Sequence, residues 1–223
     1  MQGDGIRIFD LTRSTTGGFD EVAGGPPYRG TVTIRYSEAD LRDLIASHPE
    51  DRRRDVEADI LGELRYHPLK PYIGPSTIIE VSASADGSIG VAELSEKLDS
   101  LKTKVAHGAN PQHIQLPSRM LLKTSFDPAG SVFPHLTPQS IDLLYREGVT
   151  LVGLDTPGPD HPRDTGASNS HHFRLRGIIW LVGLDLGAFK GIQGGMLLAA
   201  PVDRGMTGPA PVRAVLVKGK SQG

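Results

Sequence analysis

The chain has 223 residues, 24 basic and 26 acidic side chains, a formal net charge of -2 and no cysteine. This balance provides no basic field for nucleic acid or an anionic membrane surface, and the lack of cysteine excludes disulfides, thiolate metal ligands and cysteine nucleophiles. No signal pattern opens the sequence and no apolar stretch approaches the roughly 20 residues of a membrane helix, so we expect a cytoplasmic protein.

The first third predicts two strands followed by a charged insert. β-prone residues predict strands over 6–12 and 31–36. Ser37 is a suitable N-cap for a short amphipathic helix, and a second helical pattern covers 55–66. Both patterns are rich in charge, so we interpret 37–67 as a charged helical insert within one domain that spans the whole chain.

The rest of the chain alternates strands with a few helices. Helices are predicted over 92–101 and from Thr137, the expected N-cap with Pro138 behind it, to a stop at Gly148. Buried or β-branched runs predict strands over 76–81, 119–124, 151–154, 177–184, 194–201 and 212–217. Strands outnumber helices, which predicts a mixed α/β fold with a largely β core.

A site is predicted where the strand 151–154 ends. Asp155 and Thr156 follow it directly, and a Pro/Gly-rich polar loop then continues to His171 and His172 without an apolar period. Polar groups that no core can bury are thus gathered beyond a rigid strand, which is where scaffolds commonly present chemistry.

Several short motifs, taken in order, resemble one known family. They are Phe9–Thr12, Tyr72–Pro75, Leu121–Thr124, Phe133–Thr137, Gly148–Pro157, Gly177–Ile178 and Pro211–Ala214. In this order they resemble the cyclase family that includes bacterial kynurenine formamidase (arylformamidase), isatin hydrolase and several polyketide cyclases. The resemblance implies a swivelling β/β/α domain, usually a homodimer, that hydrolyses or cyclises a small molecule at a carbonyl.

The family's metal-binding run is absent. Members typically hold one or two divalent metals through His-x-Gly-Thr-His-x-Asp-x-Pro-x-His, a later His and a Glu. When His67 is set on the last His of the run, Glu63 falls on the Asp, Leu61 on the second His and Glu57 on the first; Val182 stands at the later Glu. A catalytic metal needs about three protein ligands, and Leu and Val offer no lone pairs. We therefore expect no metal and no other cofactor.

The resemblance places the family's late His at His171 or His172, which would shuttle a proton. The alternative is a surface pair on a loop. His67 and Glu63 are further acid-base candidates, although a His at a helix end also neutralises terminal carbonyls and Glu63 also fits a solvated helix face.

Three residues are candidates for substrate binding. Asp155 and Thr156 close the strand at the predicted site, but both are also ordinary turn formers, so the two roles stay equally open. His135 precedes a helix N-cap and is interpreted mainly as a packing residue. His161, in the polar loop, receives no role.

These observations leave three hypotheses. The first is a metal-independent enzyme of the cyclase family that performs ring closure or dehydration at a carbonyl of a small biosynthetic intermediate. The second is a metal-dependent amide or lactone hydrolase resembling arylformamidase, with zinc or manganese held by Glu57, Glu63, His67 and His171. The third is a catalytically inactive binding subunit. All three imply a small-molecule ligand and a homodimer, with no nucleic-acid or membrane partner.

Overall fold

The computed structural model describes residues 6–12, 32–35, 42, 46, 50, 69–106, 116–124, 126–127, 133–164, 166–201 and 208–219. The predicted charged insert at 37–67 lies outside these residues except for Arg42 and Ala46, which are helical, and Glu50. No helix among the described residues has the length and apolar content needed to cross a membrane. The assignment of the whole chain to one domain stays a prediction.

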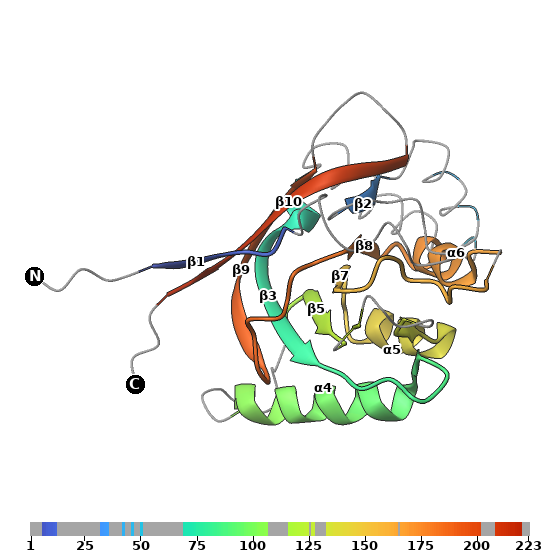
Figure 1. Cartoon of the computed structure of the whole chain (residues 1–223), viewed down its shortest axis with the longest axis horizontal. Coiled ribbons are helices and arrows are strands. Elements are labelled where there is room, and N and C mark those ends of the chain that lie inside the picture. The colour runs from blue at the N-terminus through green and yellow to red at the C-terminus, as the bar shows by residue number, and fades with distance from the viewer. Residues whose placement is uncertain are drawn as a thin grey trace, which may run out of the picture.

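The described elements follow the predicted alternation of strands and helices (Figure 1). The helices are α4 (Val91–Ala106), α5 (Pro138–Arg146), α6 (Ser168–Leu175) and a 3-10 turn (Lys70–Tyr72). The strands are β1 (Arg7–Asp10), β2 (Val32–Arg35), β3 (Ile73–Glu80), β4 (Ser88–Ile89), β5 (Arg119–Lys123), β6 (His135–Leu136), β7 (Leu151–Leu154), β8 (Ile179–Val182), β9 (Gln193–Pro201) and β10 (Gly208–Lys218). The fold class predicted from the sequence, mixed α/β, is confirmed.

Eight of the strands form one sheet in the order β1-β10-β2-β8-β7-β5-β3-β9, in which β3, β5, β7 and β8 are parallel. The sheet curls on itself because the long strand β10 pairs with β1, β2 and β9, which come from both ends of the strand order. Its first part, Gly208–Pro211, pairs with β2, while Val212–Val217 pairs with β9 at the opposite end of the strand order. Figure 1 shows β9 and β10 running together along one side of the molecule.

The two faces of the curled sheet bury two separate apolar clusters. Alternate residues such as Ile78, Leu121 and Leu197 point into the curl and pack together. Their neighbours, among them Ile79 and Leu122, pack on the outside against α4, α5 and α6. Because both faces of the parallel strands are covered, β7 and β8 are buried at every position, as their continuous apolar runs predict.

Helix α5 forms as its sequence signals require. The Thr137 hydroxyl accepts the backbone N–H of Ser140 at 3.2 Å, and Pro138 occupies the first turn. Gly148 ends the helix with φ of 78°, a conformation that glycine adopts without strain. The chain then enters β7 directly, so this helix sets where the predicted site begins.

The prediction of an unbroken loop from Asp155 to His172 is wrong, because Ser168–Leu175 forms α6. The Asp164 carboxylate accepts the backbone N–H groups of Gly166 and Ser168 and so satisfies donors at the start of the helix. Only Asn169 and Phe173 are buried side chains of α6. Since Phe173 is the only buried apolar side chain of α6, its sequence has no repeating apolar stripe from which a helix could be predicted.

Candidate functional site

Asp155 joins the ends of two neighbouring parallel strands. The side chain is 6% exposed, and its two oxygens accept the backbone N–H of Thr124 at 2.9 Å and the Thr124 hydroxyl at 2.6 Å. Thr124 directly follows β5, and Asp155 directly follows β7. The carboxylate therefore fixes the carboxyl-terminal edge of the sheet, which is where α/β sheets commonly bind ligands.

Thr156 connects the same loop to the next strand. Its side chain is fully buried and donates a hydrogen bond to the Gly158 carbonyl at 2.9 Å, while its own carbonyl accepts the N–H of Gly183 at 2.8 Å. Both residues predicted to bind substrate thus hold backbone in place. The Thr156 side chain bonds the backbone two residues on, as a turn former does, whereas Asp155 acts over a longer range, between β5 and β7.

His135 lies in β6 and packs against His161, a loop residue without a predicted role. The rings of His135 and His161 are perpendicular, with centroids 4.8 Å apart. Burial lowers the pKa of His135, and a charged His161 would lower it further; the hydrogen bond with the Phe133 carbonyl and the charges of Asp86 and Asp160 act in the opposite direction. The net lowering favours a neutral His135 imidazole. No local pattern marks this pair, because tertiary structure alone brings residues 135 and 161 together.

The loop after β7, helix α6 and β6 are bound into one unit. The Asn169 amide donates to the Leu136 carbonyl at 2.6 Å and to the Pro159 carbonyl at 2.9 Å. The Asp160 carboxylate accepts the backbone N–H of Ser170 at 2.9 Å and also its hydroxyl. Because these bonds join three elements, α6 has a fixed position relative to the loop that begins at Asp155.

The two adjacent histidines of α6 have different environments. His172 Nε2 lies 2.9 Å from Asp142 Oδ1 on α5, and Arg176 Nε donates to the same oxygen at 2.6 Å. His171 is exposed. His172 therefore connects two helices, and His171 is the one whose imidazole is open to solvent.

The Asp142 contact predicts a measurable dependence of stability on pH. Burial raises the pKa of Asp142, but the hydrogen bonds from His172 and Arg176 outweigh it and hold the pKa below its ordinary value of 3.8. Since the folded pKa lies below the unfolded value, this carboxylate stabilises the fold above about pH 4, and the stabilisation is lost as the pH falls. We expect Asp142→Asn to lower the free energy of unfolding by about 0.5 to 1 kcal/mol at pH 7 and by less at pH 3.

Urea unfolding of wild type and variant between pH 3 and pH 7 measures this difference. Asp99→Asn is the control, because the Asp99 side chain is 71% exposed and its nearest cation, Lys102, is 3.9 Å away. A loss for Asp142→Asn that does not change with pH would show that the carboxylate charge has no part in joining the helices.

The described residues do not fit a metal centre. No group of three or more His, Asp or Glu side chains in this part of the chain is arranged to hold a metal ion. Val182, which stands at the family's Glu, lies in β8, is 2% exposed and belongs to the outer apolar cluster. The other candidate positions, Glu57, Leu61, Glu63 and His67, lie outside the described residues.

Comparison with known proteins supports the predicted resemblance, although no family model matches the chain. Kynurenine formamidase from Bordetella pertussis is 27% identical over 229 residues, which cover 94% of this chain and 97% of the relative. Isatin hydrolase A from Labrenzia aggregata has a TM-score of 0.62 at 15% identity, over 96% of this chain and 94% of the other.

A second similar structure is a potential metal-dependent hydrolase with cyclase activity. Its TM-score is 0.58 at 18% identity, and the match covers 97% of this chain and all of that protein. At these identities the two structures establish the fold, and the sequence match adds the relation to formamidase. The chain is therefore a weak homologue of kynurenine formamidase that has the mixed α/β fold of isatin hydrolases and related cyclases.

Proposed function

We propose that this protein is an enzyme that closes or opens a ring at a carbonyl of a small biosynthetic intermediate, without a metal ion. The similarity to kynurenine formamidase over 94% of the chain supports enzyme chemistry, and the names of the structural neighbours include both hydrolase and cyclase activity. Ring closure with loss of water and hydrolysis of the ring are the two directions of one reaction. A single site serves both.

One observation carries the metal-independent part of the proposal. At the position where the resemblance places a glutamate ligand, Val182 presents a buried aliphatic side chain within an apolar cluster. An aliphatic group has no lone pair for a cation, and Leu61 likewise stands where the family has a histidine. Without a metal, the carbonyl has to be polarised by hydrogen-bond donors, and the protons have to be moved by side chains.

His171 is the proton carrier in this proposal. Its exposure on α6 leaves the imidazole accessible, whereas Asp142 already holds His172. In ring closure His171 takes the proton of the attacking N–H or O–H group as the new bond to the carbonyl carbon forms. It then returns the proton to the departing oxygen, and one water is released. His67 and Glu63 stay proposed acid-base partners, and Asp155, Thr156 and His135 are proposed to shape the pocket.

Isatin provides a direct assay, because opening its ring is the hydrolysis of a cyclic amide. The protein is purified without chelator, its zinc and manganese content is measured, and ring opening is followed by absorbance before and after treatment with a chelator. We expect sub-stoichiometric metal and a rate that the chelator leaves unchanged.

We expect His171→Ala to lower kcat by about 100-fold or more with unchanged thermal unfolding, since positioned acid-base groups contribute about that much. His172→Ala is the matched control and should lose stability rather than kcat.

The second candidate is a metal-dependent amide or lactone hydrolase. It is favoured by the near full-length similarity to kynurenine formamidase and by the likeness to a potential metal-dependent hydrolase. Glu57, Glu63, His67 and His171 would be its ligands. Stoichiometric zinc or manganese, with activity that chelation removes and the metal restores, would replace the first proposal by this one.

The third candidate is a binding subunit without catalysis. It predicts that neither isatin nor an aryl formamide such as formanilide is hydrolysed under any metal condition, and that His171→Ala leaves the biological activity intact.

We also propose a homodimer, as the resemblance implies. Light scattering coupled to size exclusion measures the mass directly, and a mass of one chain contradicts it.

A further inference from the structure

A groove opens at the carboxyl-terminal ends of β3 and β5, between these strands and α4. Its volume is about 780 Å³. One wall is α4, the other runs along Val81–Ala83 and the turn at Gly191–Ile192, and Thr124 lies at the strand ends. In Figure 1 the arrowhead of β3 points toward α4, which lies across the end of the sheet. In open α/β sheets the carboxyl ends of parallel strands are the usual place for a ligand.

Helix α4 presents a basic face to this groove. Lys97, Ser100 and Lys104 all line it, and their spacing of three and then four residues places them on one side of a helix. The adjacent side of α4, with Leu94, Leu98 and Leu101, packs on the outer face of the sheet. The two lysines and the serine are therefore held along the groove by the burial of the apolar side.

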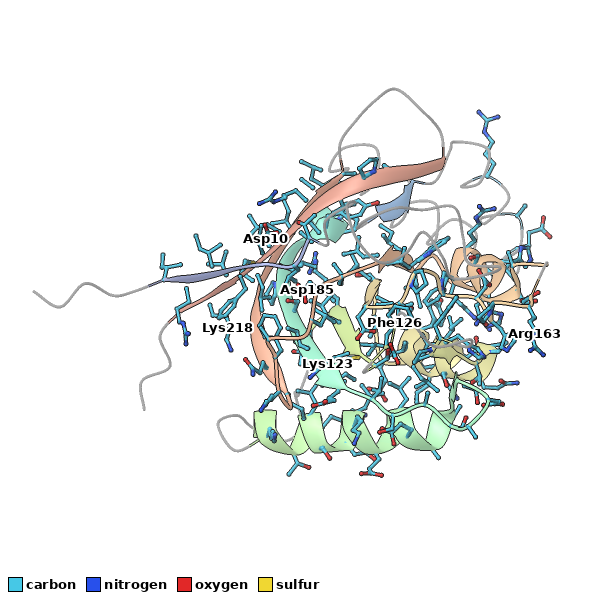
Figure 2. All side chains as sticks on the ribbon, in the orientation of Figure 1. Asp10, Lys123, Phe126, Arg163, Asp185 and Lys218 are labelled. Atoms are coloured by element: carbon cyan, nitrogen blue, oxygen red, sulfur yellow. The ribbon has the colours of Figure 1, made fainter. Side chains whose placement is uncertain are left out.

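The acidic groups near the groove already have partners. Glu80 lies 3.3 Å from Lys123 Nζ and accepts the Gly191 N–H at 3.3 Å, and these two contacts lower its pKa. Lys123, labelled in Figure 2, lies at the end of β5 on the side of α4. Its ammonium also donates to the Phe189 carbonyl at 2.7 Å.

Glu93 is engaged in the same way. Its carboxylate accepts the backbone N–H of Ser82 at 2.8 Å and lies 3.6 Å from Lys97 Nζ. Among the described residues that line the groove, Lys97 and Lys104 are basic and Glu80 is acidic, which leaves an excess of one positive charge. The excess lies at Lys104, for which the described part of the chain provides no ion pair.

The remaining lining indicates what kind of anion fits. Val81, Ala83 and Ile192 give the groove an apolar side opposite the lysines. The groove runs along the later turns of α4, away from its first residue, Val91, so the positive end of the helix dipole does not contribute. A single excess charge beside an apolar wall suits an organic monoanion better than inorganic phosphate, which needs several donors converging on one point.

We propose that this groove binds a small organic carboxylate, with the carboxylate between Lys97 and Lys104 and the apolar body against Val81, Ala83 and Ile192. The inference rests on the groove alone and does not depend on the reaction proposed above. Ser100 lines the same groove and adds a hydroxyl donor for the carboxylate, whereas the Thr124 hydroxyl already donates to Asp155.

The test uses 4-fluorobenzoate as probe and fluorine NMR of the full-length protein. Its neutral counterpart, 4-fluorobenzamide, has the same ring and size without the charge. We expect the benzoate to bind in the millimolar range with an affinity that falls as salt is raised, and the benzamide to show no saturable binding. Equal binding of both probes, or no binding of the benzoate, overturns the proposal.

Substitutions locate the site. Lys97→Gln and Lys104→Gln are each expected to weaken benzoate binding by about fivefold, and together by about 25-fold if their contributions are independent. Lys102→Gln makes the same charge change on the same helix, but Lys102 pairs with Glu147 outside the groove and should leave binding unchanged. Ala83→Trp fills the groove and is expected to abolish binding.

Thermal unfolding of each variant shows that the fold is retained. Benzoate binding that Lys102→Gln weakens as much as Lys104→Gln does would mean general charge attraction and would overturn the site. Benzoate binding that survives Ala83→Trp but is lost in His171→Ala would place the probe at the catalytic residue and would likewise overturn it. A failed isatin assay leaves this result unaffected, so the two proposals are tested separately.

Discussion

Gly153→Ala is expected to lower the free energy of unfolding by about 2 to 3 kcal/mol, because it adds a methyl group to a filled core. Gly153 lies in β7 between β5 and β8, and a Cβ atom there would come within 2.5 Å of Leu121 Cδ2 and 2.6 Å of Leu184 Cδ1. Both leucine side chains are fully buried in the cluster inside the curled sheet, so neither moves without displacing others. Urea unfolding followed by circular dichroism measures the loss.

Gly90→Ala is the matched control, since a Cβ atom at Gly90 meets nothing within 4 Å. We expect it to cost less than about 1 kcal/mol, as surface substitutions usually do. The double variant Gly153→Ala, Leu184→Val removes one of the two atoms that the new methyl group meets and should regain part of the stability. A Gly153→Ala protein as stable as wild type would mean that β7 is packed less tightly against its neighbours than the contacts indicate.

Asp155→Ala is expected to lower the free energy of unfolding by about 3 kcal/mol, since hydrogen bonds to a charged group contribute about 1.5 to 3 kcal/mol each and the two bonds act as a unit. The substitution leaves the Thr124 N–H and hydroxyl without the carboxylate that accepts them at 2.9 and 2.6 Å. Thr124 is itself 4% exposed, so water replaces the carboxylate only partly. The unfolding midpoint in urea is the measurement.

Asp185→Ala is the control at the end of the neighbouring strand β8. Asp185 is exposed and accepts only the Gly187 N–H at 3.2 Å among the described contacts, so we expect a loss below about 1 kcal/mol. Thr124→Val, combined with Asp155→Ala, completes a double-mutant cycle. If the stability losses of Thr124→Val and Asp155→Ala simply add in the double variant, the Thr124–Asp155 hydrogen bond does not stabilise this edge of the sheet.

The same variants separate positioning from catalysis at this edge. Asp155 and Thr156 hold backbone, so activity per folded molecule in Asp155→Ala should fall by less than in His171→Ala. A loss of isatin ring opening in Asp155→Ala as large as in His171→Ala, with the fold intact, would assign Asp155 to the chemistry itself.

Local sequence signals were sufficient for the elements that carry their own pattern. The Thr137–Pro138 start and Gly148 stop gave α5, and the continuous apolar run gave β7 with the polar edge at Asp155. These predictions are confirmed because a capping residue, a stop glycine and an apolar run each act within a few neighbouring residues. The resemblance to formamidase and isatin hydrolase was predicted from the order of short motifs. The sequence match to kynurenine formamidase and the structural match to isatin hydrolase A confirm it.

Tertiary structure alone decided the features that depend on residues far apart in the chain. Helix α6 is held by Asn169 reaching the carbonyls of Leu136 and Pro159, and no apolar stripe announces it. Packing between distant segments also brings His135 against His161 and closes the sheet through β10. It likewise gives His172 a partner in Asp142 and leaves His171 exposed. A sequence shows which groups a segment offers, but the partner of a buried polar group is fixed only when distant segments pack.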